Sequence, residues 1–335
     1  MAKTVRVAMI GSGGMANAHI GPLQSLKDVE VVGFCDLNLE LAQAMAAKHG
    51  GDAFGDAAEM LDAVKADCAY VLLPPFAHGK AEMACIERDV PFFVEKPINN
   101  DWKQACGIAK AVAEKGLVTS AGYMNRYRKG IQAAKKALVK DPAVYVYGGW
   151  IGGSPPPVAT SNIGAWWVQK AKSGGQFVEQ VTHTVDVVRF LCGEGVEVSA
   201  FAAQGFNSGI ENYDIDDATA VSVKFADGGV CNLVSCCASN AKGGVFLDVY
   251  AKNIAYHFEG WGHDCTVYKP GKENETIPGS EDIFRVEDEA FTKAVRAGTD
   301  KGILCSYADA LGTLEITLAA NKSAETGKVV KLKGA

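Results

Sequence analysis

A glycine-rich motif near the start of the chain has the spacing of a phosphate-binding turn. Gly11, Gly13 and Ala16 form G-x-G-x-x-A directly after an apolar run that ends at Ile10. The first glycine allows a tight turn, the second lets the backbone approach a pyrophosphate, and the alanine lets the next helix pack closely. Because a helix start offers unpaired N–H groups, the motif predicts a dinucleotide site. The residues expected to contact the dinucleotide are Gly11, Ser12, Gly13, Gly14, Met15 and Ala16.

An acidic residue, Asp36, ends the second apolar run, at the distance of about 20 residues expected for a ribose-binding carboxylate. A carboxylate there accepts hydrogen bonds from the adenosine ribose and repels a 2′-phosphate. Neither Arg nor Lys occurs between Asp36 and Lys48. The sequence therefore predicts NAD as the cofactor, with NADP less favoured. The alternative is a glycine-rich turn in an α/β protein that binds no nucleotide.

A lysine that could stabilise a developing alkoxide follows the apolar run 91–94, in the tripeptide Glu95-Lys96-Pro97. Ligands of open α/β sheets bind outside the carboxyl ends of the strands, so Lys96 is expected to project toward the nicotinamide. An ammonium group there can stabilise the alkoxide that precedes hydride loss. The alternative is a surface lysine before a proline-fixed turn.

A histidine follows the glycine pair Gly174-Gly175. If one helix follows this pair, Glu179 and His183 lie one turn apart on the same face, and Asp186 could fix the imidazole tautomer. A histidine has a suitable pKa to remove a proton from an alcohol. The alternatives are a core histidine satisfied by Asp186, and a metal site of Glu179 and His183 that lacks further ligands. No metal is predicted.

The chain changes its pattern near residue 123. Up to there, short β-branched runs alternate with Ala-rich helical stretches, which indicates a parallel sheet covered on both faces. The strands expected are 5–10, 29–35, 68–73, 91–94 and 118–121, and the helices are 15–26, 38–49, 57–65, 77–88 and 100–115.

Longer alternating strands follow, and Asp227-Gly228-Gly229 marks a hairpin turn. The helices expected in this part are 127–139, 284–298 and 306–326, and the strands are 143–149, 196–201, 218–225, 230–235 and 245–251. The fold class expected is therefore α/β. Residues 1–123 form a doubly wound parallel sheet of the Rossmann type, and residues 124–335 form an α/β domain with a large open mixed or antiparallel sheet.

The bulk composition excludes several classes of partner. The net charge of −6 and pI of about 5.6 come without a basic stripe, which argues against nucleic acid and anionic membranes. None of the ten cysteines forms a CxxC pair, a pattern typical of reduced thiols. An early first strand leaves no room for a signal peptide, and no apolar run is long enough to span a bilayer. The expected location is the cytoplasm.

Taken in order, these motifs resemble the Gfo/Idh/MocA family of oxidoreductases (glucose–fructose oxidoreductase, inositol dehydrogenase and relatives). The segments that carry the resemblance are residues 11–16, Asp36, Pro74-Pro75 with His78, Glu95-Lys96-Pro97, Gly122 with Asn125-Arg126, and Gly174-Gly175 with His183 and Asp186. The resemblance implies that Lys96 and His183 form the catalytic pair, assisted by Glu179. It implies an open sheet that forms homodimers or homotetramers. Relatives commonly have Asp at the position of Glu179 and Asn at that of Pro75.

The resemblance also extends the expected site. Further cofactor contacts are Leu73, Pro74, His78, Glu95 and Lys96. Aromatic faces stack on sugar rings, so the pair Trp166-Trp167 is a candidate for the pocket, with core or interface packing as the alternative. The substrate-binding residues expected are Tyr123, Asn125, Arg126, Trp166, Trp167, Glu179 and His183. The Gly/Pro-rich segment 152–162 is expected to be a lid or an arm toward a partner subunit.

The function expected is NAD-dependent oxidation of a secondary hydroxyl of a sugar, polyol or related cyclic alcohol, or the reverse reduction. The substrate binds between the domains, His183 takes the hydroxyl proton, Lys96 stabilises the alkoxide, and hydride passes to the nicotinamide. One alternative is a glycosidase that oxidises the ring transiently and recycles its NAD. A second is a non-catalytic NAD-binding regulator.

Overall fold

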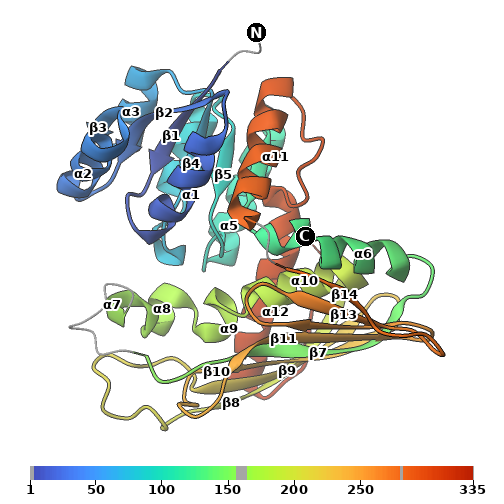
Figure 1. The fold of residues 1–335 in the computed structure, drawn as a ribbon. Coiled ribbons are helices and arrows are strands. Elements are labelled where there is room, and N and C mark those ends of the chain that lie inside the picture. Colours follow the sequence, from blue (N-terminus) through green and yellow to red (C-terminus); the bar gives the residue numbers. More distant parts are fainter. Residues whose placement is uncertain (1–3, 156–163, 280–281, 335) are drawn as a thin grey trace. The chain divides into compact units, whose positions relative to one another are not determined.

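The computed structural model describes residues 4–155, 164–279 and 282–334. They belong to two compact units, and each unit consists of two separate stretches of the chain (Figure 1). Unit 1 comprises Met1–Met124 and Asp282–Ala310, and unit 2 comprises Asn125–Glu281 and Leu311–Ala335.

Unit 1 contains a six-stranded sheet in the order β3-β2-β1-β4-β5-β6, and every neighbouring pair is parallel. The strands are β1 (Val5–Ile10), β2 (Val29–Cys35), β3 (Asp52–Phe54), β4 (Cys68–Val71), β5 (Phe92–Val94) and β6 (Thr119–Ala121). The strand order reverses between β1 and β4, which places the ligand crevice of such sheets outside their carboxyl ends. The expected Rossmann-type parallel sheet is confirmed.

Helices cover this sheet, and two 3-10 turns follow its strands. They are α1 (Gly14–Ser25), α2 (Leu39–His49), α3 (Ala57–Val64), η1 (Pro75–Ala77), α4 (Lys80–Glu87), α5 (Trp102–Lys115), η2 (Met124–Tyr127) and α11 (Ile283–Ala297). The helix expected from residue 77 begins at Lys80, because the chain first forms η1 with Pro75 at its first position. The three-residue strand β3 was not expected, since it is too short to show a period.

The return of residues 282–310 to unit 1 was not part of the expected division at residue 123. Its helix α11 packs against α1 (Figure 1). Phe291 of α11 is fully buried, and its ring lies 5.5 Å from that of Tyr70 and 5.9 Å from that of Phe93. This core face explains why a helix so late in the chain belongs to the first unit.

Unit 2 contains a nine-stranded sheet in the order β14-β13-β12-β11-β7-β10-β9-β8-β15. Only β7 and β10 pair in parallel among the described strands of this sheet, so the expected mixed sheet is confirmed. The strands are β7 (Ala143–Ile151), β8 (Gly195–Ala203), β9 (Ala218–Phe225), β10 (Val230–Cys236), β11 (Gly244–Ala251), β12 (Ala255–Glu259), β13 (Asp264–Tyr268), β14 (Glu275–Ile277) and β15 (Val330–Lys331). The last four were not expected.

One face of this sheet forms the core of unit 2. Residues of β9 alternate between buried and exposed, and the buried set packs on helices. The helices of this unit are α6 (Lys129–Leu138), α7 (Gly164–Trp167), α8 (Lys170–Ser173), α9 (Gln176–Glu179), α10 (Thr182–Cys192) and most of α12 (Tyr307–Thr326). The predicted hairpin turn joins β9 to β10, with Gly228 at φ +94°.

No helix in the described ranges combines the length and apolar character needed to cross a membrane. The segment expected to be a lid or arm, 152–162, lies from residue 156 onward outside the described residues.

Candidate active site

The turn between β1 and α1 has the backbone shape that its glycines predict. Gly11 has φ +98°, and a Cβ atom there would collide with the carbonyl oxygen of Leu72. Gly13 precedes the first turn of α1, and no described atom lies within 4 Å of the position that its Cβ would take. The start of α1 therefore has open space beside its unpaired N–H groups, which fits a pyrophosphate.

Asp36 is connected to this turn by a hydrogen bond. Its Oδ2 accepts from the backbone N–H of Ser12 at 2.9 Å, and its Oδ1 accepts from that of Asn38 at 2.9 Å. Each carboxylate oxygen has capacity for a further donor. The half-buried carboxylate beside the glycine turn is thus suited to the ribose of a dinucleotide.

Lys96 follows β5 and is half-buried. Its backbone N–H donates to Oε2 of Glu95 at 2.9 Å, and Glu95 is 3% exposed. The other oxygen, Oε1, lies 3.1 Å from Nε2 of His19, which comes from α1 and is fully buried. On its other side, Nδ1 of His19 lies 2.8 Å from Oδ1 of Asp288 on α11. The side chains of Glu95, His19 and Asp288, here called the buried triad, are therefore connected to the backbone of Lys96 through Glu95.

The central histidine of the buried triad is positively charged near neutral pH. Burial alone would lower the pKa of His19, but the charges and hydrogen bonds of Asp288 and Glu95 outweigh it and raise that pKa to about 10. His19 is therefore an imidazolium near neutral pH and donates one N–H to each carboxylate. Gly122 leaves room for Glu95, since a Cβ there would lie 2.9 Å from Oε1. Sequence reasoning missed His19 and Asp288, which are 269 residues apart.

The other cofactor candidates of unit 1 follow the neighbouring strands. Leu73 and Pro74 are half-buried after β4, at the same strand edge as the glycine turn and Lys96. His78 follows η1, and its Nδ1 lies 2.6 Å from Oε1 of Glu82. Tyr123 follows β6 and is 1% exposed. Parallel strands bring these residues to one edge of the sheet.

Glu179 and His183 are not on one helix, so that expectation was wrong. The helix is interrupted between α9 and α10 at Gln180 and Val181. The N–H of Val181 donates to the carbonyl of Gln176 at 3.0 Å. Glu179 ends α9, and its Oε2 accepts from Nε1 of Trp167 at 2.9 Å.

His183 lies at the start of α10 and is 6% exposed. Its ring meets that of Trp261 edge-on at 5.4 Å, and the ring of Trp261 lies 5.4 Å from that of Trp150. Sequence reasoning missed both tryptophans. Trp261 stands between Gly260 and Gly262, and an aromatic residue in such a turn was a usable signal.

Arg128 holds the turn that carries Trp261. Its Nη2 donates to the carbonyl of Trp261 at 3.1 Å, and its Nη1 donates to that of Gly279 at 2.6 Å. Its Nε donates to Oδ1 of Asn125 at 2.8 Å, so Asn125, which is 1% exposed, belongs to the same support.

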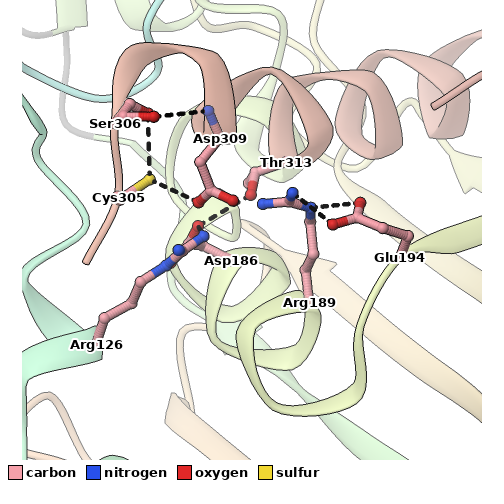
Figure 2. A network of polar contacts seen from close by, with 8 residues as sticks. All are labelled: Arg126, Asp186, Arg189, Glu194, Cys305, Ser306, Asp309 and Thr313. Atoms are coloured by element: carbon pink, nitrogen blue, oxygen red, sulfur yellow. Dashed lines mark hydrogen bonds and ion pairs between the residues drawn. The ribbon is translucent and has the colours of Figure 1, made fainter. Parts of the chain in front are cut away.

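Asp186 forms a bidentate ion pair with Arg126 inside unit 2 (Figure 2). Nε and Nη2 of Arg126 donate at 2.8 and 2.7 Å, and Oγ1 of Thr313 donates at 2.9 Å. Both charged side chains are buried, and two-point pairing satisfies them. Substrate binding by Arg126 and control of the His183 tautomer by Asp186 stay predictions.

Figure 2 also shows two smaller contacts. Arg189 pairs with Glu194 in unit 2 at 2.6 Å, and Sγ of Cys305 lies 3.2 Å from Oδ2 of Asp309 in unit 1.

The two expected pocket tryptophans differ in burial. Trp167 is 5% exposed and packs with Val168, Ile215 and Cys237, whereas Trp166 is half-buried beside that cluster. Trp167 therefore combines core packing with its hydrogen bond to Glu179.

Comparison with known proteins defines the class first: an oxidoreductase with an NAD-binding domain. Residues 5–123 match the model of an oxidoreductase family with an NAD-binding Rossmann fold, and residues 145–255 match the GFO/IDH/MocA C-terminal domain. The two matches cover more than half of the chain. The protein therefore belongs to the Gfo/Idh/MocA family, and the prediction of NAD is confirmed.

Several relatives match nearly end to end. The 4-carboxy-2-hydroxymuconate-6-semialdehyde dehydrogenase of Sphingobium sp. is 24% identical over 94% of this chain and 99% of its own. The NAD⁺-dependent scyllo-inositol 2-dehydrogenase of Bacillus subtilis is 24% identical over 99% and 97%. A solved structure of levoglucosan dehydrogenase with NADH has a TM-score of 0.88 at 19% identity, over 99% of this chain and 100% of its own. This last likeness shows the shared fold.

Proposed function

We propose that this protein is an NAD-dependent dehydrogenase that oxidises a secondary hydroxyl of a sugar, polyol or related cyclic alcohol, or reduces the corresponding ketone. The observation that carries the proposal is the place of Lys96. It follows β5 at the strand edge that holds the glycine turn, and the buried triad fixes its backbone. Relatives named as inositol and D-glucoside dehydrogenases support a cyclic alcohol as the substrate class.

In this proposal each unit supplies one residue of the catalytic pair. His183 takes the proton of the substrate hydroxyl, since a histidine titrates near neutrality. The ammonium group of Lys96 stabilises the negative charge that develops on the oxygen. Glu179, oriented by Trp167, holds a second hydroxyl and so fixes which carbon is presented.

NAD, when bound, supplies the hydride acceptor. The residues that would hold it are those of the glycine turn, with Asp36 at the ribose and Leu73, Pro74, His78, Glu95 and Lys96 along the strand edge.

A panel of cyclic polyols, aldoses and glycosides with NAD and with NADP tests the proposal, followed through the absorbance of the reduced cofactor. We expect turnover of at least one cyclic alcohol with NAD and weaker turnover with NADP. Binding of NAD without turnover of any probe contradicts the proposed reaction.

We also propose that the protein forms a homo-oligomer through the outer face of the nine-stranded sheet. Aromatic rings line this face, with Tyr145 and Tyr250 stacked at 6.1 Å and Tyr147 and Phe246 at 5.3 Å. Phe201, on β8 two strands beyond β10 in the same sheet, is 78% exposed. Such a patch on a soluble protein is typical of an association surface. Tyr250→Lys should convert the oligomer to smaller species in analytical ultracentrifugation, and an unchanged mass would contradict it.

A further inference from the structure

A buried carboxylate is bound from two sides on the helix that carries His183. Asp186 lies one turn after His183 on α10 and is fully buried. Its Oδ2 accepts from Nε of Arg126 at 2.8 Å, and its Oδ1 accepts from Nη2 of Arg126 at 2.7 Å and from Oγ1 of Thr313 at 2.9 Å (Figure 2). We call the three side chains of Arg126, Asp186 and Thr313 the α10 clamp.

The two partners of Asp186 come from distant parts of the chain. Unit 2 comprises Asn125–Glu281 and Leu311–Ala335, so the chain enters it twice. Arg126 directly follows the start of the first stretch, and Thr313 lies near the start of the second, on α12. One carboxylate on α10 therefore binds both segments through which the chain enters unit 2.

Arg126 is fixed at its side chain and at its backbone. Its guanidinium carbon lies 5.0 Å from the ring centre of Phe190, which follows Asp186 by one turn on α10. Its backbone carbonyl accepts from Nε2 of Gln132 on α6 at 2.6 Å. A planar guanidinium pairs with a carboxylate at two points in one orientation. The pair therefore fixes the rotation of α10 about its own axis as well as its position.

The α12 side of the clamp depends on a close approach of two helices. Gly312 precedes Thr313, and a Cβ atom at Gly312 would collide with the guanidinium of Arg189 on α10. That guanidinium donates to the carboxylate of Glu194 at 2.8 and 2.6 Å (Figure 2). The missing side chain of Gly312 thus lets the hydroxyl of Thr313 come within reach of α10.

The spacing in the sequence predicts other roles for these residues, namely control of the His183 tautomer by Asp186 and substrate binding by Arg126. Both oxygens of Asp186 already accept from the clamp. A buried ion pair is weak evidence for stability, and it can instead specify one arrangement of the helices around it. The arrangement specified here is that of the helix with the proposed general base.

We infer that Asp186 is a positioning residue, which acts through α10 to hold His183 where it can take the proton of the substrate hydroxyl. The inference rests on the proposed dehydrogenase function, and it gives Arg126 and Thr313 the same task. Because α10 is separated from α9 by a break, its start is not held by a continuous helix. A displacement of about 1 Å can lower the rate by roughly 10²-fold, so such a clamp affects catalysis.

A matched pair of threonine variants tests the inference. Thr313→Val keeps the size of the side chain and removes the hydroxyl that donates to Asp186. Thr317→Val makes the same change one turn later on α12, where the hydroxyl is also fully buried but donates to the carbonyl of Leu314 at 2.9 Å. We expect kcat for a cyclic alcohol with NAD to fall about tenfold in the first variant and to stay within about twofold in the second.

The same change in a second background shows whether the effect passes through His183. In the His183→Ala protein, Thr313→Val should alter the residual kcat by less than about twofold, because the group that the clamp positions is gone. Equal fold losses in both backgrounds would reveal a general structural effect and overturn the inference.

A charge-conserving variant separates positioning from substrate binding and from direct action on the imidazole. Arg126→Lys keeps the charge but cannot pair at two points. We expect a lower kcat with KM changed by less than about twofold, and the same factor across the pH profile of kcat. A rise in KM at constant kcat overturns the inference in favour of substrate binding by Arg126. A shifted acid limb of the profile overturns it in favour of direct control of the imidazole.

Hydrogen exchange tests the clamp without any substrate. The amides of residues 182–186 should exchange about tenfold faster in Thr313→Val than in Thr317→Val, when followed by mass spectrometry. Equal exchange overturns the inference and leaves the dehydrogenase standing. Faster exchange together with no turnover of any cyclic alcohol supports the clamp and contradicts the proposed function.

Discussion

The two residues proposed for catalysis lie in opposite kinds of surroundings. Lys96 in unit 1 rests on a buried ionic chain in which His19 is charged and lies between two carboxylates. The ring of His183 in unit 2 meets that of Trp261 edge-on at 5.4 Å. The backbone of Lys96 is held by a chain of charged side chains, whereas the imidazole of His183 has an indole ring as a neighbour.

The largest effect is expected from His183→Ala. Removing a general base lowers kcat by roughly 10²–10⁴-fold, while the affinity for NAD, measured by calorimetry, should stay within about twofold because the glycine turn belongs to unit 1. His257→Ala, in the sheet of unit 2, is the matched control. Wild-type turnover of the His183 variant would contradict the proposal that His183 is the general base.

A pair of His19 variants tests whether the buried triad positions Lys96. His19→Gln can still place an amide N–H toward Glu95, whereas His19→Asn reaches only toward Asp288. Removing the buried cation should destabilise both proteins by about 3–5 kcal/mol in urea unfolding. If the triad positions Lys96, kcat should recover in the Gln variant relative to the Asn variant, with similar stability. Equal kcat values would reduce the triad to a structural role.

The pH dependence of stability offers an intermediate effect. The pKa of His19 is raised from 6.5 to about 10 in the folded protein, so its contribution is fully present below pH 6.5 and is lost as the pH rises through 10. Between those values the wild type should lose about 1.4 kcal/mol of this stabilisation per pH unit. Urea midpoints at pH 7 and 9 should fall more steeply for the wild type than for His19→Asn. Parallel slopes would show that His19 is neutral in the folded state.

The smallest effect is expected from Trp261→Ala. The change removes the edge-on contact with the ring of His183, and one aromatic contact is worth about 0.5–1.5 kcal/mol, so kcat should fall by up to about tenfold, with a smaller change in KM for a cyclic alcohol. Phe206→Ala, which removes a ring that is 75% exposed elsewhere in unit 2, serves as the control. A rise in KM at constant kcat would show that Trp261 contacts the substrate rather than positioning His183.

Local patterns in the sequence predicted most of the fold and part of the candidate site. The alternating strand Ala218–Phe225 has the predicted bounds, and Gly11 has the predicted conformation. Features that depend on distant partners were missed. The carboxylate Asp288 completes the triad from the far end of the chain, and a break at Gln180 separates Glu179 from His183. Neither leaves a periodic signal, because each depends on what packs against the segment.

The late return of α11 has a consequence for synthesis on the ribosome. His19 emerges early, and the carboxylate that compensates it on α11 emerges only after most of unit 2 has been made. Until then, His19 lacks one of its two carboxylate partners, and the aromatic core around Tyr70 and Phe93 lacks the helix that covers it. The first 124 residues of a nascent chain therefore lack this helix, and stay accessible to chaperones, until about the last tenth of translation.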